Sequence, residues 1–158
     1  MQYNGMISSL REIVSKVSGG FQKAAEHMSM YIASDPESYV KAGKAVGSGQ
    51  CVALVQKATG APPTSQWIKG PDVWGNATIP VGTAIATFIN GKYPSMSSGN
   101  HAAIYMGQDK DGIHVIDQWL GHKPSKRTIS IKSKSSNIVN HPENYSVVLS
   151  DKMHGPKK

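Results

Sequence analysis

The chain has 158 residues, of which 39% are hydrophobic and 17% charged, so it belongs to the folded proteins with one domain and not to the disordered ones. Its formal net charge of +7 favours anionic partners such as nucleic acid, acidic lipid or an acidic cell-wall polymer. The basic residues are dispersed along the chain, however, so we do not expect a nucleic-acid partner. No run of about 18 apolar residues is present, which excludes a membrane-spanning helix. Residues 1–5 lack the charged leader and apolar stretch of a secretory signal, so we expect no cleaved signal peptide.

The first 35 residues carry two helical patterns. Apolar residues recur at spacings of three and four over 6–17, and a weaker stripe of the same kind covers 21–32. The sequence Ser34-Asp35-Pro36 then breaks the chain. We expect residues 1–35 to form a helical extension, most simply a support packed on the domain that follows.

The central helix is predicted over 51–59. Ser48 is its candidate N-cap, and Gly60, followed by two prolines, is its expected end. Residues 61–80 read as an irregular loop.

Short strands bounded by turn residues are predicted over 84–88, 101–106, 113–119, 128–131 and 146–149. One central helix followed by about five antiparallel strands is an α+β layout, with helices packed on one face of the sheet. We expect residues 36–150 to form this domain and residues 151–158 to form a basic flexible tail.

Cys51 is the only cysteine of the chain, so an intrachain disulfide is impossible. It opens the predicted helix, where the free N–H groups of the first turn stabilise an anion and lower the pKa of a thiol. Only the thiolate is a good nucleophile, and His101 is the candidate base that generates it. The pattern therefore predicts a Cys–His acyl-transfer enzyme, against the simpler interpretation of Cys51 as a small buried hydrophobic residue.

Such an enzyme also needs a group that fixes the orientation of the imidazole. If residues 107–111 form a five-residue hairpin loop, Asp117 lies opposite His101, and the two share one face of the sheet beneath the helix. A slip of one residue would present Gln118 instead. We favour Asp117 as the orienting residue and keep Gln118 as the alternative.

The expected substrate-binding residues are Gln50, Trp67, Gln118 and Trp119. The Cys51 N–H and the Gln50 side chain would hold the developing oxyanion. Trp119 follows Asp117 by two residues, although both tryptophans have packing as an alternative role. One cysteine and scattered histidines offer no paired ligand spacing, so we expect neither a metal site nor a cofactor.

Three segments of the sequence resemble papain-fold cysteine hydrolases of the NlpC and CHAP type. They are Gly49-Gln50-Cys51 at a helix start, Asn100-His101-Ala102-Ala103-Ile104, and Asp117-Gln118-Trp119, and their order of Cys, His and a third polar residue is that of the superfamily. CHAP enzymes often carry Glu or Asn at the third position, where this chain has Asp117.

Within that superfamily, the runs at 47–52, 67–70 and 82–86 are similar to small bacterial amidase effectors exported by type VI secretion. The resemblance covers roughly residues 40–150. It implies cleavage of amide bonds in peptidoglycan stem peptides or cross-links, delivery to the periplasm of a target bacterium, and an immunity protein as a further partner. The alternative is a non-catalytic module that binds cell wall or peptide on the same scaffold.

Overall fold

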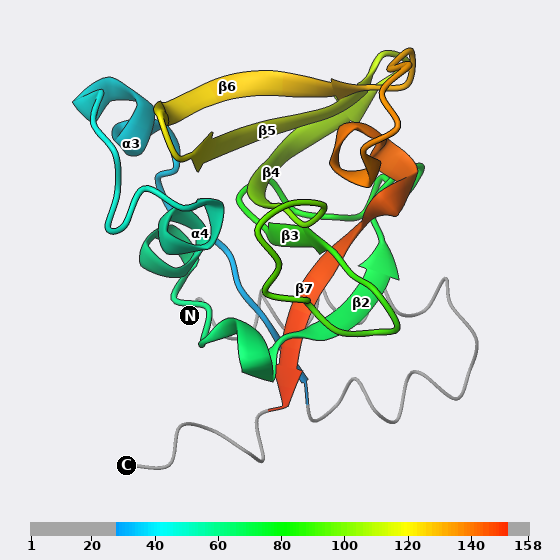
Figure 1. Ribbon diagram of the computed structural model, residues 1–158, viewed down its shortest axis with the longest axis horizontal. Coiled ribbons are helices and arrows are strands. Elements are labelled where there is room, and N and C mark those ends of the chain that lie inside the picture. The colour runs from blue at the N-terminus through cyan, green and yellow to red at the C-terminus, as the bar shows by residue number, and fades with distance from the viewer. Residues whose placement is uncertain (1–27, 152–158) are drawn as a thin grey trace.

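The computed structural model describes residues 28–151 (Figure 1). Its helices are α3 (Glu37–Ala42) and α4 (Cys51–Thr59), with 3-10 turns η1 (Thr64–Gln66), η2 (Ile138–Asn140) and η3 (Pro142–Asn144). Its strands are β1 (Met28–Met30), β2 (Ile68–Asp72), β3 (Ala84–Thr87), β4 (Ala102–Asp109), β5 (Gly112–Trp119), β6 (His122–Ser130) and β7 (Tyr145–Asp151). The predicted α+β class is confirmed, and the fold is papain-like.

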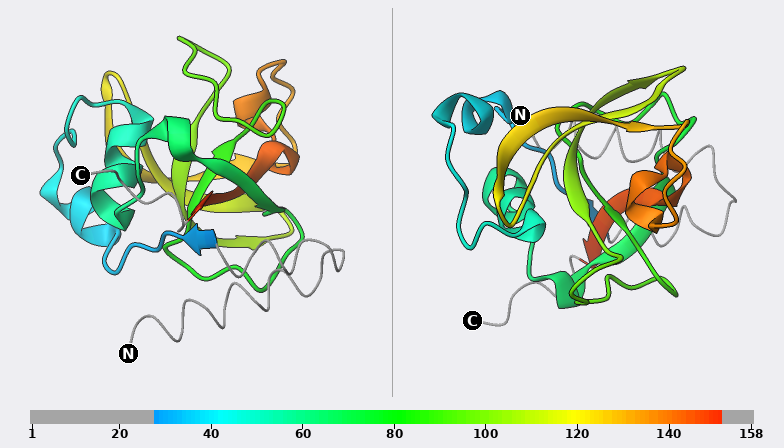
Figure 2. Two further views of the ribbon diagram at one scale, coloured as in Figure 1. Left: turned by 90° about the horizontal axis from the view of Figure 1, so that it is seen from below. Right: turned by 45° about the horizontal axis from the view of Figure 1, so that its top comes forward.

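The strands form one antiparallel sheet in the order β1-β7-β3-β4-β5-β6, and β2 also pairs with β7. Figure 2 shows that the sheet is strongly curved, and that β5 and β6 arch over one end of it. Helix α4 packs against β4 and β5, and α3 packs against β6. Buried residues form two clusters, one on each face of the sheet. Helix α4 covers only one of these two faces.

Helix α4 has the predicted bounds. Gly60 ends it with a left-handed φ of 77°, and its N–H bonds the carbonyl of Gln56, as expected of a glycine at this position. The predicted cap is wrong, because the N-cap is Gln50 and Ser48 Oγ instead accepts a bond from the Gln50 N–H at 3.3 Å. The nucleophile candidate Cys51 is the first residue of the helix.

Two stretches predicted as helix and loop contain strands instead. The helix predicted over 21–32 is wrong at Met28–Met30, because these residues form β1, which pairs with β7 and buries Met30. The part of this predicted helix up to residue 27, and the whole of the one predicted over 6–17, lie outside the described residues. Strand β2 crosses the predicted loop at 61–80 and tolerates Pro71 because its register with β7 shifts there. Gly70 is required in β2, since a Cβ atom would lie 2.7 Å from the carbonyl oxygen of Val147.

The β4–β5 hairpin has a two-residue turn, not the predicted five-residue loop. Ile104 pairs with Ile116 and Tyr105 with Val115, which shifts the pairing by two residues from the prediction. Side chains alternate between the faces with a period of two, so this error leaves Asp117 on the predicted face of the hairpin. The expectation that this face lies beneath the helix is wrong, because α4 packs into the cluster that contains Ile104 and Ile116.

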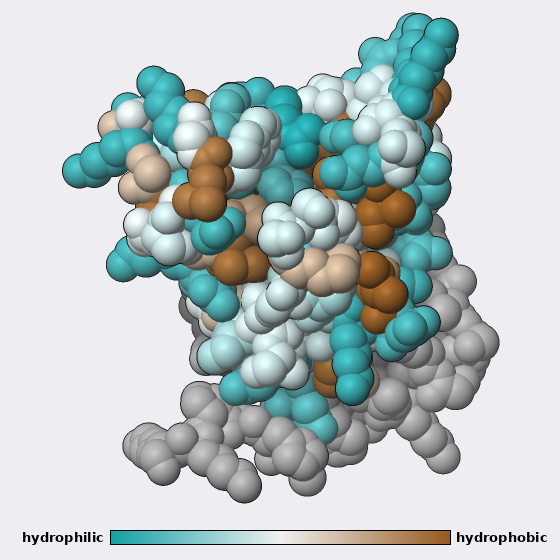
Figure 3. Space-filling view, in the orientation of Figure 1, coloured by the Kyte–Doolittle hydropathy of each residue, from teal (hydrophilic) through white to brown (hydrophobic). Residues whose placement is uncertain are grey.

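The surface seen in Figure 3 is mostly hydrophilic, and its hydrophobic residues occur in separate small groups. The large hydrophobic side chains exposed in the described part of the chain are Val81, Ile89, Met96, Trp119, Leu120 and Ile131. Across residues 28–151, no helix has both the length and the apolar character that a membrane span needs.

Candidate active site

Cys51 lies at the N-terminus of α4, where its sulfur is 3.6 Å from the hydroxyl of Tyr93. Asn100 donates from Nδ2 to the same hydroxyl oxygen at 3.0 Å. Because Asn100 occupies a lone pair of that oxygen, the phenolic proton is free to point at the sulfur. Cys51 is only 9% exposed, so few waters compete for this contact.

His101 and Asp117 form a buried pair. His101 Nε2 lies 2.7 Å from Asp117 Oδ2, and the two residues are 7% and 0% exposed. The backbone of His101 is fixed by Thr87, which accepts from the His101 N–H at 3.0 Å and donates its own N–H to the His101 carbonyl at 3.0 Å. With Nε2 directed at the carboxylate, Nδ1 is the ring nitrogen available to Cys51.

The interaction between Cys51 and His101 favours the charged form of both groups. Burial raises the pKa of the thiol, yet the hydrogen bond and positive charge of His101 outweigh it, with help from Tyr93, so the pKa of Cys51 is lowered from its ordinary value. Burial likewise opposes ionisation of the imidazole, but the bonds to Asp117 and Cys51 raise the pKa of His101 to about 9. Each group therefore favours the charged form of the other, a thiolate beside an imidazolium.

Arg127 completes the charge arrangement. It donates from Nε to Asp117 Oδ2 at 2.6 Å, so one carboxylate oxygen accepts from both Arg127 and His101. Arg127 stands on β6, where Val115 is its cross-strand partner and Ser125 is the partner of Asp117. The predicted strand at 128–131 began one residue too late to include Arg127, because β6 begins at His122.

Gln118 is fully buried on the side of the sheet that faces α4. Its Oε1 accepts from the Val46 N–H at 2.9 Å, and its Nε2 donates to the carbonyls of Val46 at 2.9 Å and Gln50 at 2.8 Å. With its amide so occupied, Gln118 fixes the segment that leads into Cys51. The residue that bonds the His101 ring is Asp117.

The two predicted tryptophans have different environments. Trp67 is 3% exposed, donates from Nε1 to the Pro62 carbonyl at 2.8 Å and packs on Tyr93 with ring centroids 4.9 Å apart. It supports Tyr93 from within the core, which is the packing role that the sequence left as the alternative. Trp119 is 41% exposed, and its ring centroid lies 6.2 Å from that of His101. Trp119 is thus accessible beside the imidazole.

Of the other residues predicted for the site, Gln50 is exposed and makes no side-chain bond to the helix that it caps. The structure thus gathers Cys51, His101 and Asp117 at one place, together with Tyr93 and Arg127, which the sequence did not indicate. In the described range 28–151, no group of three or more His, Cys, Asp or Glu side chains is arranged to hold a metal ion. A thiolate, a proton-carrying imidazole and an orienting carboxylate are the groups that nucleophilic acyl transfer requires.

The known proteins that are similar to this chain are amidase effectors by name. A solved structure of type 6 secretion amidase effector 2 superposes with a TM-score of 0.64 at 36% identity, covering 80% of this chain and 99% of that one. The type VI secretion amidase effector 2 protein of Salmonella typhi is 41% identical over 130 residues, which span 75% of this chain and 98% of the relative. Domesticated amidase effector 2 of Ixodes scapularis is 34% identical over 108 residues, 66% of this chain and 74% of the relative. The family model for domesticated amidase effector 2 matches residues 22–148, and the chain therefore belongs to that family.

Proposed function

We propose that the protein is a cysteine amidase that cleaves amide bonds of peptidoglycan stem peptides or cross-links. The observation that carries the proposal is the alignment of Cys51, His101 and Asp117, with a lowered thiol pKa and a raised imidazole pKa. The names of the relatives support amide-bond cleavage. The net charge of +7 suits an acidic murein target, because opposite charge raises the encounter rate.

The acylation half of the reaction begins with the Cys51 thiolate. Its sulfur attacks the amide carbonyl carbon and forms a tetrahedral oxyanion, held by the Cys51 N–H at the helix start and by the Gln50 side chain. As the C–N bond breaks, the His101 imidazolium gives its Nδ1 proton to the departing nitrogen. The amine leaves and the acyl group remains on Cys51 as a thioester.

The second half returns the enzyme to its starting state. Water attacks the thioester carbonyl while His101, now neutral, accepts the proton that the water loses. The carbon–sulfur bond then breaks, and the products are a carboxylic acid and the thiolate–imidazolium pair. Throughout, Asp117 holds Nε2 and stabilises the imidazolium, and Arg127 holds Asp117.

The type VI secretion relatives also support a biological setting. In this proposal the protein is an antibacterial effector that is delivered to the periplasm of a target bacterium, and the producing cell makes an immunity protein that blocks the site. Export of the protein to the periplasm of a test bacterium should then lyse the cells, and Cys51→Ala should abolish lysis.

Purified sacculi test the chemistry directly. The wild-type protein should release new muropeptides, resolved by chromatography, and mass spectrometry of a defined cross-linked muropeptide should identify the bond that is cut. Cys51→Ala should release none while keeping the circular dichroism spectrum and thermal midpoint of a folded protein. Equal release by the alanine variant would refute the proposal, and tight binding without release by the wild type would favour a non-catalytic binding module.

A further inference from the structure

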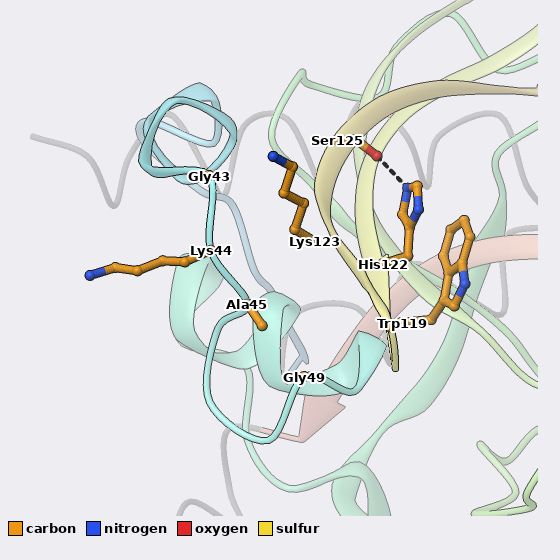
Figure 4. Close-up of a pocket in the computed structure, with 9 residues that line it drawn as sticks. Gly43, Lys44, Ala45, Gly49, Trp119, His122, Lys123 and Ser125 are labelled. Atoms are coloured by element: carbon orange, nitrogen blue, oxygen red, sulfur yellow. Dashed lines mark hydrogen bonds between the residues drawn. The ribbon is translucent and has the colours of Figure 1, made fainter.

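A pocket of about 540 Å³ lies beside the candidate active site, between the segment that joins α3 to α4 and the tip of the β5–β6 hairpin (Figure 4). Its walls are Gly43, Lys44, Ala45, Gly49, Trp119, Gly121, His122, Lys123 and Ser125. The first four residues precede Cys51 in the chain, and the others follow Asp117. The pocket is therefore built by the two segments that also position the nucleophile and the orienting carboxylate.

Trp119 connects the pocket to the reacting groups. Its indole lies edge-on to the His101 ring, at 6.2 Å between centroids and 71° between planes. A ligand that contacts this indole is thus one ring away from the imidazole. Since His101 is the group that protonates the departing amine in the proposed reaction, the pocket lies where the leaving portion of a substrate would extend.

The wall of the pocket is held in a defined shape. Trp119 stacks on His122 with ring centroids 3.9 Å apart and planes 8° apart, and Figure 4 shows the two rings side by side. His122 Nε2 bonds Ser125 Oγ at 2.7 Å, and the Arg127 guanidinium carbon lies 5.3 Å from the centroid of the Trp119 ring. A flat, preformed aromatic wall of this kind suits the aliphatic part of a peptide.

The charged residues that line the pocket are both lysines, Lys44 and Lys123, and its nine lining residues include no Asp or Glu. Figure 4 shows the Lys44 side chain pointing away from the other lining residues, whereas Lys123 rises beside Ser125 and His122. Within residues 28–151, Lys123 makes no ion pair, although Lys126 on the same strand pairs with Glu37 at 2.6 Å. Lys123 is therefore an exposed cation at the pocket with its charge available to a ligand.

We propose that this pocket is the subsite for the leaving portion of the substrate, a peptide segment that carries a free carboxylate, with Lys123 contacting the carboxylate and Trp119 packing on the aliphatic chain. The proposal rests on the proposed amidase function for the identity of the ligand as substrate. The net charge of +7 does not say where an anionic substrate binds, and this proposal places its carboxylate at Lys123. Lys69, which follows Trp67 and Ile68 in the chain, already pairs with Asp72 at 3.6 Å and does not line this pocket.

The test uses two muropeptides that differ in one group on the leaving side of the scissile amide. One muropeptide carries a free carboxylate at that position, and the other carries a carboxamide. Cys51→Ala protein, which cannot turn either over, is titrated with both by calorimetry. We expect it to bind the carboxylate form about five- to tenfold more tightly, as one charge-assisted contact at a partly exposed site provides. The added change Lys123→Gln should remove this preference. The matched control Lys110→Gln should keep the preference. It removes the same charge in the β4–β5 turn, at the end of β5 that is opposite to Trp119.

Kinetics of the Cys51 protein separate the two proposals. Lys123→Gln should raise KM for the carboxylate substrate about five- to tenfold, leave kcat within twofold, and leave the carboxamide substrate unaffected. No preference in the Cys51→Ala titration, or one that survives Lys123→Gln, would overturn the subsite even if cleavage is observed. A Lys123-dependent preference in a protein that cleaves neither peptide would uphold Lys123 as a carboxylate contact and refute the amidase proposal, and with it the identity of the ligand as substrate.

Discussion

Arg127 donates to Asp117 Oδ2 at 2.6 Å, to the same oxygen that lies 2.7 Å from His101 Nε2. The other oxygen, Oδ1, is buried and has no hydrogen-bond partner within residues 28–151. The carboxylate is thus held between two cationic side chains through one atom. This geometry fixes the direction from which Asp117 contacts the imidazole, and it makes Arg127 a positioning residue that we expect to act through Asp117.

Replacing Arg127 tests that role. Arg127→Met leaves a buried carboxylate with one partner, and we expect the free energy of unfolding to fall by about 1–3 kcal/mol, below the full cost of breaking a buried pair because Arg127 is 26% exposed. We also expect kcat to fall about tenfold, with KM nearly unchanged. Denaturant titration and steady-state kinetics measure the two effects.

Arg127→Lys is the matched control for charge. It keeps the cation but loses the planar guanidinium contact, so its kcat should lie between those of the wild type and Arg127→Met. If the free energy of unfolding falls as expected but kcat does not change in either variant, Arg127 has a structural role only.

The pH dependence of activity should reflect a thiolate–imidazolium pair. Above its raised pKa of about 9, His101 loses the proton that it gives to the leaving amine in the proposed reaction. As the pH falls through the lowered pKa of Cys51, the thiolate is lost. We therefore expect a bell-shaped profile of kcat/KM whose alkaline limb lies near pH 9. An alkaline limb that begins near 6.5, the ordinary value for histidine, would contradict the ion pair.

Alkylation of Cys51 by iodoacetamide at pH 6 isolates the thiol from turnover. Wild-type protein should react faster than a free thiol under the same conditions, because its pKa is lowered. His101→Gln should react more slowly than the wild type by tenfold or more, since burial remains and the compensating charge is gone. Equal rates for the two proteins would show that His101 does not activate the sulfur.

Tyr93 should contribute a smaller part of the same effect. Tyr93→Phe removes the hydroxyl that lies 3.6 Å from the sulfur, and we expect alkylation at pH 6 to slow about two- to fivefold, as for one weak hydrogen bond to an anion. Tyr105→Phe is the control, because its hydroxyl accepts from Gln108 Nε2 at 3.0 Å instead. If both variants react at the wild-type rate, the Tyr93 hydroxyl does not stabilise the thiolate.

Gln118 should affect the site through the chain that precedes Cys51. Gln118→Leu breaks three hydrogen bonds to the backbone of Val46 and Gln50, and we expect a loss of about 2–4 kcal/mol in the free energy of unfolding and slower alkylation of Cys51 in the folded protein.

Gln108→Leu provides the comparison. Gln108 also bonds a neighbouring segment, through the Gly75 N–H and the carbonyls of Val73 and Asn76, but far along β4 from His101. It should lose stability to a similar degree without changing the reactivity of Cys51. A parallel loss of reactivity in both variants would show that the effect of Gln118 is global.

Local signals in the sequence determined the parts of the site that depend on neighbouring residues. A glycine-rich turn before an apolar run places Cys51 at a helix start, and Gly60 ends that helix as predicted. Alternation along the strands placed Asp117 on the same face as His101 even though the hairpin turn was wrong, because an error of two residues restores the same side-chain direction. These features need only the period of each element.

The tertiary structure decided every role that depends on which elements become neighbours. Arg127 reaches Asp117 because β6 pairs with β5 over its full length, and Tyr93 reaches Cys51 from the β3–β4 connection. Trp67 and Gln118 were predicted at the substrate, but packing buries both. Contacts between residues distant in the chain leave no periodic trace in the sequence, so the partners of the candidate catalytic groups become visible only once the sheet order and the position of α4 are known.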